Sequence, residues 1–308
     1  MKHIKKQILL SFLLLHSCFT WAQYAWRLPI YDAQLGDSQV IIVGVAHASR
    51  IPTEAYVHQA IRLLEGAQAV AVESTELRER KHPVSPNYLS EDGVPLSLTK
   101  TAKECIDNEA RRGLKSGWKK NEDSILHLWQ ILSDLYDSDA LAPTGDFFPG
   151  IDYVARVFAK RQNIEVVPLE TTQEAFSFDQ KQSDQNLLRA IDSLCVAIAS
   201  PAITQMYKSA QEEALKAAQT GDPERVRAIV FKANREILGL ANPDFHYVAQ
   251  RNTNIAAAIA NLSKSFRRSV VLVGILHLSG DSSLQKLLRN MGYDVLEISV
   301  ANKRFRDH

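Results

Sequence analysis

The sequence has almost no net charge, and this narrows the class of partners. Its 308 residues carry a formal net charge of +1, from 36 basic and 35 acidic side chains. Three of the positive charges lie at Lys2, Lys5 and Lys6, ahead of the part of the chain that we expect to fold. Binding to nucleic acid relies on a marked excess of basic residues. We therefore exclude nucleic acid as a partner.

Cysteine is also scarce, with three residues in the chain. Cys105 and Cys195 lie in no thiolate spacing typical of zinc and next to no histidine, so we assign no catalytic or thiolate–metal chemistry to them. In an oxidising compartment the two can form a disulfide, whereas two buried free thiols fit the sequence equally well. The sequence leaves this alternative open.

Long apolar runs are absent after the first 22 residues, so we expect no transmembrane helix in the mature chain. The chain begins with a basic segment, Met1–Lys6, a short apolar segment, Ile8–Leu15, and a Thr20-Trp21-Ala22 ending. This pattern is typical of a bacterial secretory signal at residues 1–22 and predicts a periplasmic or secreted protein. The alternative is a lipoprotein anchored through Cys18, although His16 is atypical for a lipid-attachment box.

One motif occurs twice, in the segments Val40–Ser49 and Val270–Ser279. Each segment is an apolar, β-branched run that ends in Gly-x-x-His, with the histidine at His47 or His277. The runs predict strands buried on both faces, and ligands of open α/β sheets bind beyond the carboxyl ends of such strands. We therefore expect both imidazoles at one site. The competing interpretation is two unrelated core strands, each followed by an ordinary loop histidine.

The remaining pattern predicts an α/β fold with a mixed, mostly parallel central sheet flanked by helices. Apolar strands are expected at 40–43, 69–73, 165–170, 270–273 and 294–298. The strand at 40–43 is expected to form an N-terminal hairpin with Tyr24–Tyr31, in which Pro29 marks an edge strand. Pro168 indicates that the strand at 165–170 lies toward an edge or ends early. Two helical stretches at about 74–145 and 172–240 are interpreted as insertions into a single domain, residues 23–308.

Two of these strands end in a carboxylate, at Glu73 and Glu170. We expect both to be parallel neighbours of the histidine strands, so that the four ends meet at one edge of the sheet. Two imidazoles with one or two carboxylates suit a divalent metal ion that keeps a position open for water. Because a single helix joins the strand before His47 to the strand before Glu73, we expect Glu73 beside His47 as the third ligand. Glu170 is then the expected general base.

Structural interpretations compete with this one at each charged residue. Glu73 also suits a salt-bridge partner or a helix cap, and Glu170 precedes a possible capped helix start at Thr171 and Thr172. Arg251 precedes the second histidine strand and fits either a surface charge or an arginine directed at a carboxylate or an oxyanion.

Several motifs together resemble one known family. They are the two Gly-x-x-His motifs, the strand that ends at Glu73, Leu169-Glu170-Thr171, Arg251-Asn252 before an alanine-rich helix, and His277-Leu278-x-Gly280. In this combination and order, over about Trp26 to Ile298, they look like the TraB/PrgY/GumN group, which is related to the Tiki proteases.

The resemblance implies a fold akin to that of erythromycin esterases and heme-binding ChaN-like proteins. It also implies a metal-dependent hydrolase that favours Mn or Co, with His47, Glu73 and His277 at the core of the site and Glu170 and Arg251 supporting them. The sequence departs from the family pattern at Val45, where threonine is common, and at Ile275 and Leu276, where the motif commonly reads Gly-Ala-Gly-His. The bulkier side chains are expected to narrow the pocket or to alter the activity.

The leading interpretation is an exported metal-dependent hydrolase, in first place a peptidase, that acts on a peptide or small-molecule substrate with Mn, Co or Zn. Two alternatives remain open. One is a non-catalytic protein of the same fold that binds heme or a small ligand through its histidines. The other is a metal-independent esterase that uses His47 as a general base. The sequence does not predict the oligomeric state.

Overall fold

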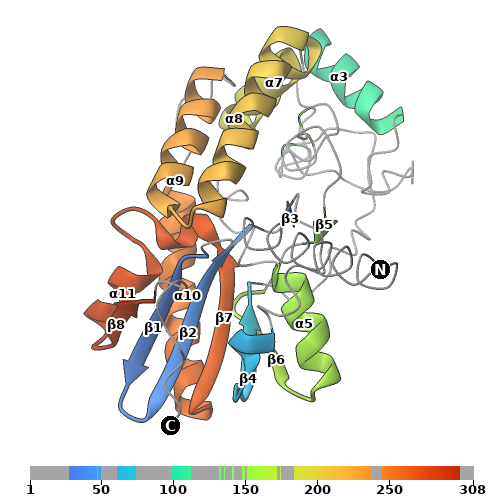
Figure 1. Cartoon of the computed structure of the whole chain (residues 1–308). Helices are drawn as coiled ribbons and strands as arrows, with labels where there is room; N and C mark the ends of the chain where they lie inside the picture. Colours follow the sequence, from blue (N-terminus) through green and yellow to red (C-terminus); the bar gives the residue numbers. More distant parts are fainter. Residues whose placement is uncertain are drawn as a thin grey trace, which may run out of the picture.

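The computed structural model describes residues 28–46, 48–49, 61–73, 99–111, 132, 135, 141, 148–149, 151–171, 174, 184–237 and 245–298. The expected signal segment at 1–22, with Cys18, and His47 lie outside these residues. The described part is a central sheet with helices on both faces, and a layer of helices stands beyond one edge of the sheet (Figure 1).

The sheet has six strands, in the order β6-β4-β7-β2-β1-β8. They are β6 (Glu165–Pro168), β4 (Ala69–Val72), β7 (Arg268–Gly274), β2 (Ser38–Val45), β1 (Ile30–Leu35) and β8 (Asp294–Glu297). β6, β4, β7 and β2 run parallel to one another, whereas β1 is antiparallel to both β2 and β8. The predicted α/β class with a mixed, mostly parallel sheet is confirmed.

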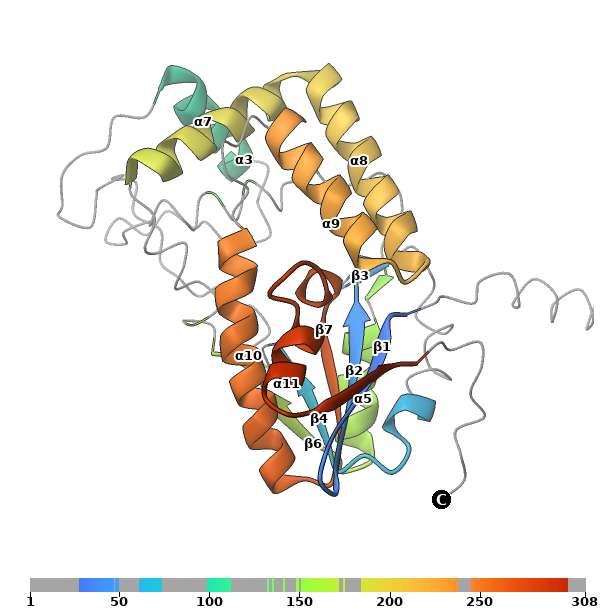
Figure 2. The same cartoon turned by 90° about the vertical axis from the view of Figure 1, so that its left-hand side faces the viewer.

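The central strands are apolar along their length because both of their faces are covered. In β2, Ile41 and Val43 pack in a cluster with α5 (Ile151–Arg161) on one face of the sheet. Val40 and Ile42 point to the other face, into a cluster with α10 (Phe245–Ser265) and α11 (Leu284–Asn290). Figure 2 shows the sheet between α5 on one side and α10 and α11 on the other. The sheet is thus the middle layer of a three-layer α/β/α arrangement.

The N-terminal hairpin is present, but its boundaries differ from the prediction. The outer strand runs from Ile30 to Leu35, and the turn is confined to Gly36, with φ 59°, and Asp37. Pro29 does not mark an edge, because β8 pairs with the side of β1 that faces away from β2. Pro29 lies just before the strand, where its missing N–H removes no bond from the ladder. The edge position predicted from Pro168 is confirmed, since β6 is an edge strand.

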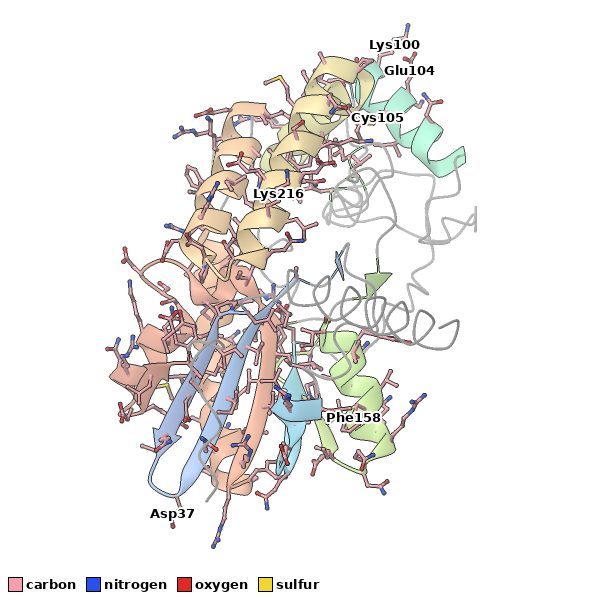
Figure 3. All side chains as sticks on the ribbon, viewed as in Figure 1. Asp37, Lys100, Glu104, Cys105, Phe158 and Lys216 are labelled. Atoms are coloured by element: carbon pink, nitrogen blue, oxygen red, sulfur yellow. A yellow bond between two sulfur atoms is a disulfide. The ribbon has the colours of Figure 1, made fainter. Side chains whose placement is uncertain are left out.

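The helical layer is built from amphipathic helices that pack on one another. It contains α3 (Lys100–Arg111), α7 (Asp184–Ala199), α8 (Pro201–Gln219) and α9 (Pro223–Lys232), and α9 continues into the π-helical turn η1 (Ala233–Ile237). A disulfide joins Cys105 of α3 to Cys195 of α7, with a Cα–Cα distance of 5.7 Å. Figure 3 shows Cys105 where α3 lies against α7, at the end of the layer remote from the sheet. The structure therefore selects the disulfide over two free thiols.

Within the described part of the chain, no single helix has both the length and the apolar character needed to cross a membrane. The segment Leu187–Ala199 with α8 meets the criteria of length and composition only as a pair, bent by 101° at Ser200.

A small second sheet, absent from the prediction, pairs β3 (Ala48–Ser49) with β5 (Phe148–Pro149) in antiparallel register. β3 follows β2 in the chain, so this pair continues the first histidine strand toward the helical layer (Figure 1).

Candidate functional site

The candidate site lies where four parallel strands end, at the edge of the sheet that faces the helical layer. Gly274, the last residue of β7, is level with Val45 of β2, and Val72 of β4 is level with both Leu272 and Pro168. The residues that follow these strands therefore meet at one edge. The structure brings Glu73, Glu170 and His277 together there. His47 lies outside the described residues, two positions after β2.

Arg251 of α10 connects the two carboxylates. Its Nε donates to Glu170 Oε2 over 3.0 Å, and its Nη2 donates to Glu73 Oε2 over 2.8 Å and also to Glu170 Oε1. The planar guanidinium thus makes a bidentate contact with Glu170, and its Nη2 also donates to Glu73. Of the two sequence interpretations of Arg251, the structure supports the arginine directed at a carboxylate.

The burial of these groups explains why they are paired. The Glu170 side chain is 1% exposed, the Arg251 side chain 14% and the Glu73 side chain 16%. A carboxylate that is nearly removed from water is costly unless it is paired and hydrogen-bonded. Arg251 supplies that partner for Glu170 and holds one oxygen of Glu73 at the same time.

The second oxygen of Glu73 points to the second Gly-x-x-His motif. Oε1 accepts a hydrogen bond from the backbone N–H of Gly274 and lies 3.5 Å from His277 Nε2. The single helix between the first histidine strand and β4 predicts Glu73 beside His47, which lies outside the described residues. The histidine strand next to β4 is the second one, because β7 lies between β4 and β2.

His277 lies in a short 3₁₀ turn, η2 (Ile275–Leu278), and is 4% exposed. Its Nδ1 is hydrogen-bonded to Asn252 Oδ1, and Asn252 itself is 1% exposed. The amide nitrogen of Asn252 donates to the carbonyl oxygens of His277, over 3.0 Å, and of Ser282, over 2.7 Å. Asn252 therefore holds both the ring and the loop that carries it.

Glu73 Oε1 and His277 Nε2 are adjacent atoms of the kinds that can bind a metal ion. Zinc bonds to oxygen and nitrogen of about 2.0–2.1 Å place two ligands of a tetrahedral site roughly 3.3–3.4 Å apart. The observed 3.5 Å between these two atoms fits that separation. Among the residues that the structure describes, no group of three or more His, Cys, Asp or Glu side chains is arranged to hold an ion.

The sequence matches the family model described as TraB/PrgY/gumN over residues 29–296. The chain belongs to this family. No curated protein and no solved structure gives a significant match to the chain.

The glycine of the first TraB/PrgY/gumN motif, Gly44, lies in close contact with two side chains. A Cβ atom added there would lie 2.6 Å from Leu278 Cδ1 and 2.7 Å from Pro29 Cγ, both closer than real carbon contacts. Leu278 directly follows His277, so this glycine lets the first motif approach the turn that carries the second histidine.

The two bulky departures from the family pattern pack against the helical layer. Ile275 is 6% exposed and lies in an apolar cluster with Val226 of α9 and the end of α8, and Leu276 packs against the same cluster. These two side chains therefore pack η2 against α8 and α9.

The residues after Glu170 form a capped turn, as the competing interpretation of that segment expected. The Thr171 hydroxyl accepts from the backbone N–H of Glu174 over 3.1 Å, and Glu174 Oε2 accepts from the backbone N–H of Thr171 over 2.7 Å. This reciprocal pair is a capping box. The hydrogen bonds from the backbone N–H and then the hydroxyl of Thr171 lower the pKa of the Glu174 carboxyl below its usual value. Glu170 takes no part in the cap, because both of its oxygens bind Arg251.

The sequence does not predict two contacts of the site, which are those made by the Asn252 side chain and by the backbone N–H of Gly274. An asparagine that follows Arg251 on an otherwise alanine-rich helix was an available signal, because a buried amide must be hydrogen-bonded. The partner of that amide could not be inferred without knowing which loop α10 faces.

Proposed function

We propose that the chain is an exported, metal-dependent hydrolase, in first place a peptidase, whose divalent ion is held by His277, Glu73 and His47. One observation carries the proposal: His277 Nε2 and Glu73 Oε1 face each other at 3.5 Å. With a proton on Nδ1, a neutral imidazole presents a lone pair on Nε2. A lone pair and a carboxylate oxygen repel each other unless a cation, either a metal ion or a second ring proton, lies at the contact.

The third ligand in this proposal, His47, follows the strand adjacent to β7. β2 and β7 end level with one another, at Val45 and Gly274. The chain therefore leaves β2 at the same edge of the sheet at which it leaves β7, and the proposal assigns the third ligand to the residue two positions after β2. Two histidines and one glutamate form a ligand set that leaves one position for water. Mn, Co or Zn bound there would lower the pKa of that water and polarise a scissile carbonyl.

The other charged residues organise the site. Arg251 holds Glu73 Oε2, which leaves Oε1 directed at His277. Glu170 holds the guanidinium through both of its oxygens, so it fixes the position of Arg251. The role of general base that the sequence predicts for Glu170 requires the carboxylate to exchange a contact with Arg251 for one with water. Substitution of Glu170 separates these two roles.

The proposal includes export, and two features support it. One is the signal-like segment at 1–22, and the other is the Cys105–Cys195 disulfide, which is typical of oxidising compartments. Mass spectrometry of the exported protein is expected to find a chain that begins at Gln23. An acylated Cys18 would indicate the lipoprotein alternative, and an intact Met1 would contradict export by either route.

The metal assignment is tested by the metal content and by titration calorimetry with Mn, Co and Zn. We expect the mature protein to bind one divalent ion per chain, and His277→Ala, His47→Ala and Glu73→Gln each to abolish most of that binding. The matched control is Glu165→Gln. It removes an exposed carboxylate from the first residue of β6, the strand that pairs with β4, at the end of β6 away from the site, and it should bind the ion as the parent does. Full occupancy in both histidine variants would refute the site.

Activity on a peptide library completes the test. We expect cleavage that is lost on chelation and restored by the ion. Glu170→Gln should keep the ion. A loss of about 10²- to 10⁴-fold in kcat would identify it as the base, whereas a smaller loss matched by Arg251→Lys would identify it as the anchor of Arg251. Cleavage that resists chelation would favour the metal-independent esterase, and a heme absorbance band that is lost in His47→Ala would favour the ligand-binding alternative.

A further inference from the structure

The amide group of Asn252 has only one orientation that satisfies its surroundings. Its nitrogen lies 3.0 Å from the carbonyl oxygen of His277 and 2.7 Å from that of Ser282, and both of these groups can only accept. A flipped amide would place an oxygen against two carbonyl oxygens in a buried position. The nitrogen therefore points to the loop and Oδ1 points to the ring of His277.

This orientation determines which ring nitrogen of His277 carries the proton. Asn252 Oδ1 is an acceptor, so the Nδ1 that faces it must donate. We propose that Asn252 is a positioning residue that holds neutral His277 as the Nδ1–H tautomer, with the lone pair of Nε2 directed at Glu73 Oε1. The inference rests on the proposed function only in the use of that lone pair, which is to bind the ion.

The constraint matters because a neutral histidine side chain in water favours the opposite tautomer, with the proton on Nε2. That form has no lone pair to offer at the position that faces Glu73. Hydrogen-bond partners of the distal ring nitrogen commonly fix the tautomer and the ring orientation of metal-binding histidines. Asn252 and His277 are 1% and 4% exposed, so water has little access to replace the amide.

The first test is the tautomer itself, measured without metal. Nitrogen-15 chemical shifts of His277, assigned with the His277→Gln variant, distinguish the imidazolium ring from each neutral tautomer. We expect the wild-type ring, once neutral, to be the Nδ1–H form. An Nε2–H form in the wild-type protein would overturn the inference. This readout does not depend on whether the protein binds metal or has activity. The inference can therefore fail while the proposed function stands, and the proposed function can fail while the inference stands.

The second test removes the amide. In Asn252→Ala we expect neutral His277 to populate the Nε2–H form and the affinity for Zn or Mn to fall by about 10- to 100-fold, the usual effect of losing such a partner. Asn261→Ala, which truncates an exposed asparagine on the same helix, is the control and should change neither quantity. If Asn252→Ala lowers Tm but leaves the tautomer and the metal affinity unchanged, Asn252 only ties the loop and the inference is wrong.

A third variant separates the ring contact from the loop contacts. Asn252→Asp keeps an oxygen opposite Nδ1 but loses the donors to the His277 and Ser282 carbonyl groups. We expect it to lower Tm, as the alanine variant does, while the Nδ1 proton is retained. Loss of that proton in the aspartate variant would contradict the assignment.

Discussion

The sheet edge and the helical layer differ in how far their arginine–glutamate pairs are exposed to solvent. At the sheet edge, Arg251 lies between Glu73 and Glu170, and the carboxylate of Glu170 is almost fully buried. In the helical layer, Arg235 and Glu236 of η1 form a pair 3.0 Å long whose side chains are 56% and 45% exposed. The contact distances of the two arginines are similar, with 3.0 Å from Arg251 Nε to Glu170 Oε2 and 3.0 Å from Arg235 Nη2 to Glu236 Oε1, but their exposure to solvent differs. The comparison indicates that burial, rather than contact distance, marks the pair that the fold depends on.

The two regions also differ in how their backbones are held. The sheet is covered on both faces by apolar clusters that contain residues from most of its strands. The helical layer packs a separate cluster of α3, α7 and α8 and adds the Cys105–Cys195 disulfide. The turn η2, which follows β7, contacts the helical layer through the apolar cluster in which Ile275 lies against α8 and α9. A loss of order in the helices is therefore expected to reach the site mainly through η2.

The largest effect is expected from breaking the buried charge cluster. Arg251→Met removes the only cation that contacts Glu170 among the described residues, and an uncompensated buried carboxylate costs about 3–5 kcal/mol of the free energy of unfolding. Urea denaturation of the variant measures this loss. The double variant Arg251→Met with Glu170→Gln should recover part of it, because the buried charge is then absent.

The matched control for this prediction is Arg235→Met in the helical layer. Its pair with Glu236 is exposed and its guanidinium lies 5.5 Å from the centre of the Phe231 ring, so we expect a loss below about 1 kcal/mol. Equal losses from the two arginine variants would end the distinction between the two regions.

The second largest effect concerns the cross-link of the helical layer. Replacing Cys105 and Cys195 by alanine opens a loop with a sequence separation of 90 residues, and removal of such a bond typically costs about 2–5 kcal/mol. We expect the loss to be local. In hydrogen exchange, α3 and α7 should lose protection while β2 and β7 keep it. Loss of protection in all four elements together would show that the two regions unfold as one unit.

Much of the sheet could be predicted from the sequence because its signals are local. β2 and β7 are continuous apolar runs that are buried on both faces, and such runs identify interior strands of a parallel sheet without any partner being known. The convergence of Glu73, Glu170 and His277 followed from the shared direction of these strands. Pro168 correctly identified an edge strand, because the missing N–H of proline restricts it to such positions.

The order of the strands could not be predicted in the same way. β7 comes late in the chain and inserts between β2 and β4, so the histidine strand next to β4 is the second one. β8 also comes from a distant part of the chain and pairs with β1, so the edge position predicted from Pro29 is wrong. The roles of Arg251 and Asn252 depend on which loops α10 faces. Each failure concerns a contact between distant segments, for which the local pattern contains no signal.

The smallest effect is expected at the capped turn beside Glu170, where an exposed charge adjoins a buried one. The hydrogen bonds from Thr171 hold the folded-state pKa of the Glu174 carboxyl below its usual value. Its stabilising contribution is therefore fully present above the pKa of the unfolded state and is lost as the pH falls through the lower, folded-state pKa. Because Glu174 is exposed, we expect only a few tenths of a kcal/mol from the charge. Thr171→Val, which removes the hydroxyl from both of its bonds, should cost about 1 kcal/mol at neutral pH.

Chemical denaturation of the parent and of Glu174→Gln at several pH values measures the contribution of this charge. The difference between the two proteins should be constant above about pH 5 and should shrink as the carboxyl is protonated. Glu104→Gln removes an exposed carboxylate that lies 3.8 Å from Lys100 in the helical layer, and it reports the effect of losing one surface charge. If the difference for Glu174 instead grows as the pH falls, the cap does not favour the ionised form. The turn after Glu170 would then be held by Thr171 alone.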